Sequence, residues 1–323
     1  MSLSLPDCWI WDFWLAKDGP DFHIYYLQAP RSVGDPTERH WHSTIGHAVS
    51  SDLQQWEILP DAIEPSAEDN NWDNFTTWTG SVIQYAGLWY MFYTGGNRRE
   101  KGLVQRIGLA ISKDLINWNK YDANPLLVSD PDRYEKLDLE LWHDQAWRDP
   151  WVIKHPSNEQ FYAYITARTN HGAPGGRGVI ALAESNDLIS WEVLDPVTSP
   201  GDFGHLEIPQ VIQVGSLWYL LFSTSAEVYS KDRIKRSGST PVTGTHYLVS
   251  EDPMGSYRYL TDEFLVGDPT GSRYGGKLVA IAKDQWVLLT MRHFDERGRF
   301  IGELDDPVPV GFKSDGIIQL DRI

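Results

Sequence analysis

The sequence predicts an all-β protein folded as a five-bladed β-propeller, and three recurring features lead to that prediction. A strand that begins with an aromatic residue occurs five times, a second strand ending in a Ser/Asp turn follows most copies, and a third strand precedes each copy. The segments between these strands lack the periodicity of about 3.6 residues that marks an amphipathic helix. Three or four strands repeated five times are typical of radially arranged sheets.

The first recurring feature is an alternating strand with an aromatic start. Its copies begin about 57 to 72 residues apart along the chain. They read FHIYYLQA from Phe22, WYMFYTGG from Trp89, FYAYITAR from Phe161, WYLLFSTS from Trp218 and WVLLTMRH from Trp286. Five copies at this spacing favour a propeller over the alternative fold, a β-sandwich with long loops.

The other two features complete each predicted sheet. The second strand reads IGHAVSSDLQQW, IGLAISKDLINW and VIALAESNDLISW, with weaker copies HYLVSEDPMGSY and FIGELDDPVPVGF. The third reads CWIWDFW, FTTWTGSVI, AWRDPWVI, HLEIPQVI and SRYGGKLVAI, each about ten residues before an aromatic start. We expect residues 1–323 to form a single domain, with the polar segment 233–245 as an exposed loop.

The amino-acid composition restricts the kinds of molecule that the protein can bind. Asp and Glu number 45 against 28 Lys and Arg, and the formal net charge of −17 would repel nucleic acid. Aromatic residues make up 13% of the chain, and their rings suit the apolar C–H faces of a neutral sugar. The single cysteine, Cys8, excludes an internal disulfide. No signal-peptide pattern and no apolar run of about 18 residues occurs, so we expect a cytoplasmic protein without a membrane partner.

Three carboxylates stand at similar positions in the predicted innermost strands. Asp12, Asp149 and Glu207 lie ten to twelve residues before the aromatic starts of their repeats, where Trp78 and Gly275 stand in the other two. Innermost strands line the central channel of a propeller, so the three acids should converge on one funnel. Because crowded carboxylates repel one another and raise their pKa values, such a cluster indicates a functional site.

The number and type of these residues suit the cleavage of a glycosidic bond. One carboxyl group donates a proton to the leaving oxygen, and a second attacks the sugar or activates water. The third can accept hydrogen bonds from ring hydroxyls, and Arg148 can hold the sugar or a neighbouring carboxylate. His40, His42 and His47 lack the helical spacing of a metal site, so we expect neither a metal nor a cofactor.

Several motifs, taken in order, resemble those of glycoside hydrolase family 32, the invertases and fructanases, and of its relative family 68, the levansucrases. FHIYYLQAP and IGHAVSSDLQQWEILPDAIEP resemble two family 32 runs, and TWTGSV resembles a third. Arg148-Asp149-Pro150 is similar to the RDP motif, and Glu207-Ile208-Pro209 is similar to the Glu-Cys-Pro motif. The run Ile10 to Trp14 is closer to family 68.

This resemblance implies a role for each acid. Asp12 would be the nucleophile, Glu207 the acid/base and Asp149 the stabiliser of the transition state, with Arg148 beside it and Ser81 near the nucleophile. The implied activity is a retaining hydrolysis of β-fructofuranosides or related furanosides by double displacement. Transfer of the sugar to another saccharide uses the same chemistry.

Departures from the family pattern concern the sugar pocket. Trp11 and Leu27 stand where family 32 has an Asn and a Gln that grip fructose. We expect Trp11 and Trp78 to close a pocket of monosaccharide size. His143 and Trp147, which flank the RDP motif, are further candidates for substrate binding. The C-terminal β-sandwich usual in family 32 is expected to be missing.

Two other interpretations stay open at this point. One is an inverting enzyme similar to family 43, acting on arabinofuranosides or xylosides with Asp12 as a general base. The other is a propeller that binds sugar without catalysis. The sequence also leaves open the exact sugar and linkage, exo or endo action, and the oligomeric state.

Overall fold

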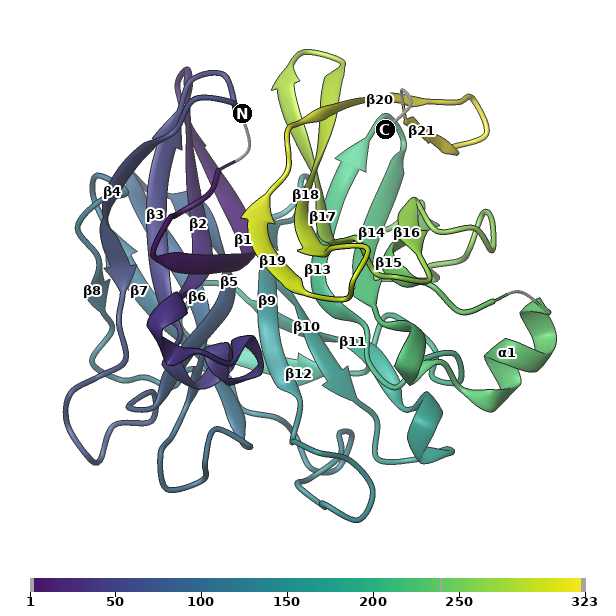
Figure 1. Ribbon diagram of the computed structural model, residues 1–323, viewed down its shortest axis with the longest axis horizontal. Helices are drawn as coiled ribbons and strands as arrows, with labels where there is room; N and C mark the ends of the chain where they lie inside the picture. The colour runs from purple at the N-terminus through teal and green to yellow at the C-terminus, as the bar shows by residue number, and fades with distance from the viewer. Residues whose placement is uncertain (1–2, 239, 321–323) are drawn as a thin grey trace.

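Five antiparallel sheets follow one another along the chain in the structure, a computed structural model that describes residues 3–238 and 240–320 (Figure 1). The first strand of each sheet contacts the first strand of the next, and the first and fifth sheets are joined in the same way. These five strands therefore surround a central axis. The ring of five sheets confirms the propeller that the repeat predicts.

Each of the first four sheets has four strands in sequence order, with the first strand innermost. The first sheet contains β1 (Cys8–Asp18), β2 (Asp21–Pro30), β3 (Thr44–Ser50) and β4 (Glu57–Ile63). The second contains β5 (Thr76–Tyr85), β6 (Leu88–Gly96), β7 (Gln105–Ser112) and β8 (Asn119–Lys120). The third contains β9 (Trp147–Lys154), β10 (Phe161–Arg168), β11 (Gly178–Ser185) and β12 (Trp191–Leu194).

The fourth sheet contains β13 (Glu207–Val214), β14 (Leu217–Thr224), β15 (Thr243–Ser250) and β16 (Val266–Asp268). The fifth contains β17 (Arg273–Ala282), β18 (Gln285–Phe294), β20 (Val308–Phe312) and β21 (Ile318–Leu320), and β19 (Phe300–Leu304) also pairs with β18. Every aromatic start of the sequence repeat falls in the second strand of its sheet. The predicted strand order within each repeat is therefore confirmed.

Short helices connect some of the strands. Four are 3₁₀ helices, at Arg31–Val33, Pro36–His42, Pro174–Gly176 and Ala226–Val228. The α-helix α1 (Lys231–Ser237) begins where the Ser230 side chain accepts a hydrogen bond from Arg233 N. The expectation of an exposed loop over 233–245 was thus wrong at both ends, because α1 and β15 extend into it. Within the described residues, no helix is long and apolar enough to cross a membrane.

A cluster of buried apolar side chains fills each interface between neighbouring sheets. Between the first and second sheets, for example, Trp14 and Tyr25 pack with Met91 and Tyr93. Burial of each such side chain stabilises the fold by about 1.5–3 kcal/mol. The ring closes in the same way, because the first and last sheets lie side by side (Figure 1) and Leu304 N donates to Leu3 O at 3.0 Å.

Every innermost strand contains a β-bulge, where its pairing with the second strand shifts. A bulge leaves residues out of the hydrogen-bonded ladder and redirects their side chains. The first unpaired residues are, in chain order, Asp12, Thr79, Asp149, Ile208 and Gly275. Except for Thr79, they have positive φ angles, a strained conformation for any residue but glycine.

The bulges correct one sequence expectation. Glu207 was placed in the same register as Asp12 and Asp149, but it lies one residue before its bulge, which begins at Ile208. Its true equivalents are Trp11, Trp78, Arg148 and Tyr274. The hairpins that join the first and second strands differ in length, so an offset counted from the aromatic start cannot resolve a single residue.

Candidate active site

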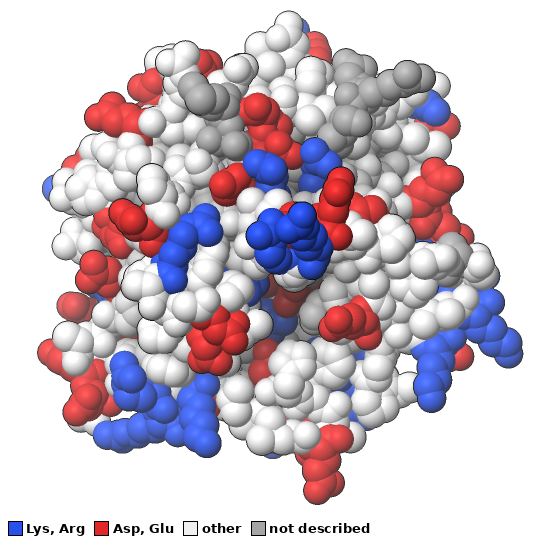
Figure 2. All heavy atoms as spheres, viewed as in Figure 1, with Lys and Arg blue, Asp and Glu red and all other residues white. Residues whose placement is uncertain are grey.

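A pocket of about 370 Å³ lies against the innermost strands of the first four sheets. The face seen in Figure 2 has a hollow near its centre, and acidic and basic side chains are interspersed over it. The residues that line the pocket are Asp12, Leu27, Thr37, His40, Trp41, Trp78, Thr79, Leu103, Gln105, His143, Asp144, Arg148, Asp149 and Glu207. The expected convergence of Asp12, Asp149 and Glu207 is therefore confirmed.

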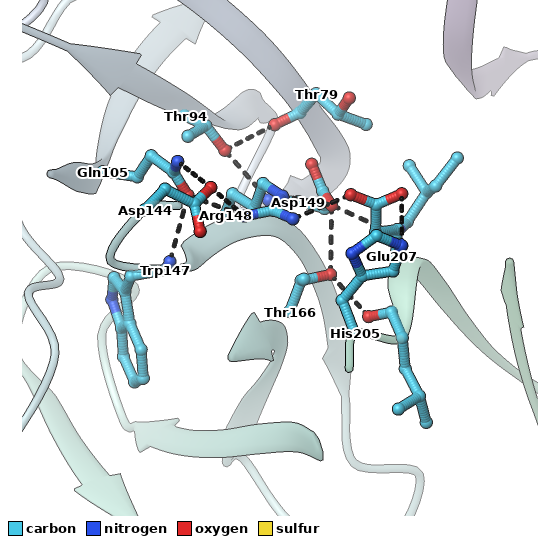
Figure 3. Close-up of polar contacts among 12 residues, drawn as sticks. Thr79, Thr94, Gln105, Asp144, Trp147, Arg148, Asp149, Thr166, His205 and Glu207 are labelled. Carbon is cyan, nitrogen blue, oxygen red and sulfur yellow. Dashed lines mark hydrogen bonds and ion pairs between the residues drawn. The ribbon is translucent and has the colours of Figure 1, made fainter. Parts of the chain in front are cut away.

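Asp149 is held by the bulge of β9 and by both neighbouring sheets. Its backbone N donates to Thr94 Oγ1 at 2.9 Å, and its Oδ2 accepts from Thr166 Oγ1 at 3.0 Å and from Ile208 N at 3.1 Å (Figure 3). Burial raises the pKa of the Asp149 carboxyl, Glu207 adds to the rise, and Arg148 opposes it. These contacts fix the carboxyl group in one orientation at the pocket wall.

Arg148 connects four polar side chains from different segments (Figure 3). Its Nη2 lies 2.7 Å from Glu207 Oε1, and its Nη1 lies 2.9 Å from Gln105 Oε1 and 3.0 Å from Asp144 Oδ2. Its Nε lies 3.7 Å from Asp149 Oδ2. Burial alone would lower the pKa of the guanidinium, but the surrounding carboxylates raise it, so Arg148 remains charged. The sequence predicted its proximity to a carboxylate, and the tightest such contact is with Glu207.

Glu207 has donors on both carboxyl oxygens. Arg148 donates to Oε1, Tyr274 OH donates to Oε2 at 2.6 Å, and His205 Nε2 lies 3.4 Å from the same Oε2. Burial alone would raise the pKa of Glu207, but His205, Arg148 and the Tyr274 hydroxyl hold it well below its ordinary value. These three neighbours therefore favour Glu207 as an anion.

Asp12 stands in contrast to the other two acids. Within the described residues its buried Oδ1 has no hydrogen-bond partner, and its backbone N donates to Met291 Sδ at 3.4 Å. A Cβ atom at Gly275 would lie 3.9 Å from Asp12 Oδ1, so the glycine keeps the space beside this oxygen open. Burial, Asp149 and Glu207 raise the pKa of Asp12 to about 8, and Arg39 and Lys277 oppose the rise. A buried oxygen without a partner can bond directly to a bound ligand.

Aromatic and apolar groups form the rest of the wall. Trp78 Nε1 donates to His40 O at 2.8 Å, and the rings of Trp78 and Trp41 lie 5.7 Å apart. His40 and Trp41 belong to the 3₁₀ helix Pro36–His42, and burial lowers the pKa of His40 to about 3. His143 also lines the pocket, as the sequence predicts. The pocket thus presents rings and polar groups together, the combination that suits a saccharide.

Three residues expected to bind substrate do not line the pocket. Trp11 is 2% exposed and packs edge-on to His40, with ring centroids 5.7 Å apart. Ser81 Oγ accepts a hydrogen bond from Val152 N at 3.0 Å between the second and third sheets. Trp147 is fully buried in that same interface. These three side chains therefore belong to the packing around the pocket and not to its wall.

The sequence reasoning missed a set of supporting hydroxyl groups. Thr94, Thr166 and Ser223 each lie five residues after an aromatic start, and each hydroxyl bonds to the backbone in, or immediately before, the innermost strand of the next sheet. Leu27 and Met291 occupy the same position in the other two repeats. Aligning the five repeats at this position would have revealed the three hydroxyl-bearing residues. Gln105 and Tyr274 were also missed as partners of the charged cluster.

No group of His, Cys, Asp and Glu in the described part of the chain has the geometry to hold a metal ion. Two of the histidines considered above as metal ligands, His40 and His47, contact other groups instead. His40 lines the pocket, and the His47 ring stacks on Tyr25 and lies 2.9 Å from His23 Nδ1.

The sequence profile of the Glycosyl hydrolases family 32 N-terminal domain matches residues 15–251. The chain belongs to glycoside hydrolase family 32. This family 32 chain is 35% identical to 6(G)-fructosyltransferase of Asparagus officinalis over 78% of its own length and 40% of that protein. It is 27% identical to sucrose-6-phosphate hydrolase of Escherichia coli over 68% of its length and 43% of that protein. It therefore spans less than half the length of these curated relatives.

Solved structures share the fold of this family 32 chain. Inulosucrase from Halalkalicoccus jeotgali bound to kestose superposes with a TM-score of 0.78 at 22% identity, over 98% of this chain and 87% of that one. Bacillus subtilis levansucrase superposes with a TM-score of 0.77 at 15% identity, over 100% and 88%. At such low identity the likeness concerns the propeller alone. It agrees with the five sheets described above.

Proposed function

We propose that this family 32 chain is a retaining glycoside hydrolase that cleaves β-fructofuranosides by double displacement and can transfer the fructosyl group to a sugar acceptor. The observation that carries the proposal is the convergence of Asp12, Asp149 and Glu207 in one pocket around Arg148. Three of the bulge residues, Asp12, Asp149 and Ile208, have positive φ angles without being glycine, and strain of this kind gathers at functional sites. A propeller that only binds sugar would not require three buried carboxylates.

Asp12 is assigned as the nucleophile. Its Oδ1 has no hydrogen-bond partner among the described residues, so a lone pair is free to attack the anomeric carbon. The bond from that carbon to the leaving oxygen breaks as the bond to Asp12 forms, and Glu207 donates its proton to the leaving oxygen. Asp149, held by Thr166 and Ile208 N, accepts hydrogen bonds from the sugar hydroxyls.

The second half of the reaction reverses the role of Glu207. The Glu207 carboxylate takes a proton from water or from the hydroxyl of a second sugar, whose oxygen attacks the glycosyl-Asp12 ester. Arg148 and Tyr274 stabilise the Glu207 anion between the two half-reactions. Hydrolysis and transfer differ only in which acceptor occupies the pocket.

The productive state requires Asp12 ionised and Glu207 protonated, whereas the protein groups around the two carboxyls favour the reverse. The acids titrate as a coupled cluster that holds one shared proton near neutral pH. Substrate hydroxyls that donate to Asp12 and Asp149 stabilise their anions, and the glycosidic oxygen accepts from Glu207. Substrate binding thereby moves the shared proton to Glu207.

The pocket volume supports exo action on a small neutral saccharide. About 370 Å³ is at the small end of ligand pockets, which span roughly 300–1,000 Å³, so one end of a saccharide would enter. The net charge of −17 accords with a neutral substrate and with no nucleic-acid partner. The cytoplasmic location stays a prediction, which fractionation of the native cells would test.

The test is to incubate the protein with sucrose, short fructans and aryl furanosides while NMR follows the anomeric form of the first product. Release of β-fructofuranose, or of a β-fructosyl transfer product, is the expected result. An α product would favour the inverting interpretation. Sugar binding without turnover of any furanoside would favour the non-catalytic one.

A further inference from the structure

Asp144 is a fourth carboxylate in the wall of the pocket, in the loop that leads into β9. Its Oδ2 accepts two hydrogen bonds, from Gln105 Nε2 at 2.8 Å and from Arg148 Nη1 at 3.0 Å (Figure 3). Its Oδ1 is buried and has no hydrogen-bond partner in the part of the chain that the structure describes. His143 Nε2 lies 3.9 Å from that oxygen, too far for a hydrogen bond. A buried oxygen without a donor is costly, so Asp144 Oδ1 is suited to accept a hydrogen bond from a bound molecule.

Asp144 lies next to the proposed acid/base, Glu207. Arg148 binds both residues with the two end nitrogens of one guanidinium group, Asp144 through Nη1 and Glu207 through Nη2 at 2.7 Å. The two carboxyl groups are therefore neighbours on the same wall of the pocket. Glu207 must contact the glycosidic oxygen, which joins the fructosyl unit to the leaving group. The leaving group therefore begins on the wall that Asp144 and Glu207 share.

The exposure of the lining residues indicates the direction in which the leaving group extends. The side chain of Asp149 is 6% exposed, that of Glu207 24% and that of His143 64%. Asp149 binds the fructosyl hydroxyls in the proposed mechanism, so the fructosyl unit occupies the closed end of the pocket. The second sugar then extends past Glu207 toward the open end, where His143 lies.

The exposed ring of His143 packs against a tryptophan that is itself held in place. The ring centroids of His143 and Trp142 lie 4.7 Å apart, with 35° between the ring planes. The guanidinium of Arg168, which is 1% exposed and lies 3.2 Å from Glu135, covers Trp142 at 3.7 Å from its ring centre. A Cβ atom at Gly204 would lie 2.4 Å from the Trp142 ring, so the glycine leaves room for it. This packing restricts the orientation of the His143 ring at the edge of the pocket.

We propose that His143 and Asp144 bind the second sugar, which is the leaving group in the first half-reaction and the acceptor in the second. The inference rests on the proposed function, in which Glu207 protonates the glycosidic oxygen. The apolar C–H face of a neutral pyranose ring lies on the His143 ring, and a hydroxyl of the same sugar donates to Asp144 Oδ1. The two residues thereby select substrates that have a sugar, and not a small alkyl group, beyond the fructosyl unit.

Two substitutions test the two contacts. His143→Ala removes the ring on which the second sugar would lie. Asp144→Asn keeps the shape of the side chain and replaces the free acceptor with a donor. Because Arg148 and Gln105 both donate to Oδ2, the amide oxygen of the asparagine stays at that place and its NH₂ group takes the place of Oδ1.

Two matched controls lie outside the pocket. His155→Ala removes a ring that also packs on an aromatic neighbour, Tyr162, with centroids 5.8 Å apart. Asp73→Asn changes a buried aspartate whose two oxygens both accept hydrogen bonds from protein groups. Thermal unfolding would show that each variant folds.

The measurement is an NMR titration of two ligands, followed on the indole N–H signals. Every variant is made in the Asp12→Asn chain, which cannot form the glycosyl ester, so only binding is observed. Sucrose has a second sugar, whereas methyl β-D-fructofuranoside has only the fructosyl unit. His143→Ala should weaken sucrose binding by about three- to tenfold and Asp144→Asn by about tenfold or more, without change for the methyl fructoside. Both controls should bind the two ligands as the Asp12→Asn chain does.

Sucrose binding no tighter than that of the methyl fructoside in the Asp12→Asn chain would overturn the proposal. An equal loss for both ligands in the two variants would also overturn it, because that result would place the effect at the fructosyl unit. Turnover is measured separately in the unmodified protein. If that protein cleaves no furanoside but sucrose binding depends on His143 and Asp144 as stated, the second-sugar site stands and the proposed function fails. If it cleaves sucrose while both variants bind sucrose normally, the proposed function stands and this inference fails.

Discussion

The hydroxyl of Tyr274 lies 2.6 Å from Oε2 of Glu207, and this contact joins the innermost strands of the fourth and fifth sheets. Both residues lie immediately before their bulges, so equivalent positions in neighbouring sheets are in direct contact. Arg148, at the equivalent position of the third sheet, holds the other oxygen of Glu207. Three equivalent positions thus provide one acid and the two groups that stabilise its anion.

Tyr274→Phe should raise the pKa of Glu207, because the substitution removes a hydrogen bond that stabilises the anion. At pH values below the acid limb of the kcat/KM profile, Glu207 is protonated in addition to Asp12. No ionised carboxylate is then left in the pair to act as the nucleophile. The acid limb should therefore move up by about one pH unit, the equivalent of a charge-assisted bond of about 1.5 kcal/mol. The comparison is with Tyr219→Phe, which loses a bond to Gly316 O away from the pocket. A shift in both variants would contradict this assignment.

The unmodified enzyme should lose activity as the pH rises through about 8. Burial, Asp149 and Glu207 raise the pKa of Asp12 to about 8, and above that pH the cluster gives up the proton that Glu207 must donate. The alkaline limb of kcat/KM, which reports the free enzyme, should therefore lie near that pH. An alkaline limb near pH 5, the range of an ordinary glutamate, would show that the acids do not share a proton as described.

Much of this arrangement could be predicted from the sequence because the fold repeats. The aromatic starts mark the second strand of each sheet, and the residue five places further on always pairs with the residue before the bulge. The predicted register was wrong by one residue at Glu207. The hairpins differ in length, and a single-residue error in register reverses the face on which a side chain lies.

The pocket lining was harder to predict, and the two tryptophans show why. Trp11 and Trp78 occupy equivalent strand positions, yet Trp78 lines the pocket and Trp11 is covered. The difference comes from the 3₁₀ helix Pro36–His42, which follows the second strand of the first sheet and places His40 against Trp11. Such connecting segments do not follow the repeat, so the residues that they place in the pocket have no repeated signal.

Thr166→Val should destabilise the protein and impair catalysis. The Thr166 hydroxyl, buried between the third and fourth sheets, is 3.0 Å from both Asp149 Oδ2 and Leu206 O. Loss of one buried hydrogen-bonding partner costs about 1–3 kcal/mol, which denaturant unfolding can measure. Thr224→Val, which loses one bond to His205 O, is the comparison. Only Thr166→Val should also lower kcat with little change in KM, because Asp149 acts mainly in the transition state.

Asp12→Asn should abolish turnover of every furanoside, by a factor of more than about 10⁴, since the amide cannot form the glycosyl ester. Substrate binding should persist, because Asp149, Arg148 and the aromatic wall remain. Isothermal titration with sucrose and kinetics on an aryl furanoside would measure the two effects. Substantial activity in Asp12→Asn would mean that another carboxylate attacks the sugar.

Glu207→Gln separates the acid from the nucleophile. The Glu207 proton is needed most when the leaving group is poorly able to carry negative charge. The substitution should therefore lower kcat/KM by about 10²–10⁴-fold on sucrose and far less on an aryl furanoside with an acidic phenol. Loss of the carboxylate also leaves Arg148 without its closest anion, at 2.7 Å, so unfolding measurements must accompany the kinetics.

A smaller residue at the same place tests the second half-reaction. Glu207→Ala cannot activate water, so the glycosyl-Asp12 ester should accumulate when the leaving group is a good one. Azide attacks that ester without a general base, because it is already an anion and needs no proton removed. Added azide should therefore restore turnover and yield a β-fructosyl azide of retained configuration, identified by NMR. An α-configured azide would point to direct displacement on the substrate, and no rescue together with equal losses on both leaving groups would assign the acid/base role to another residue.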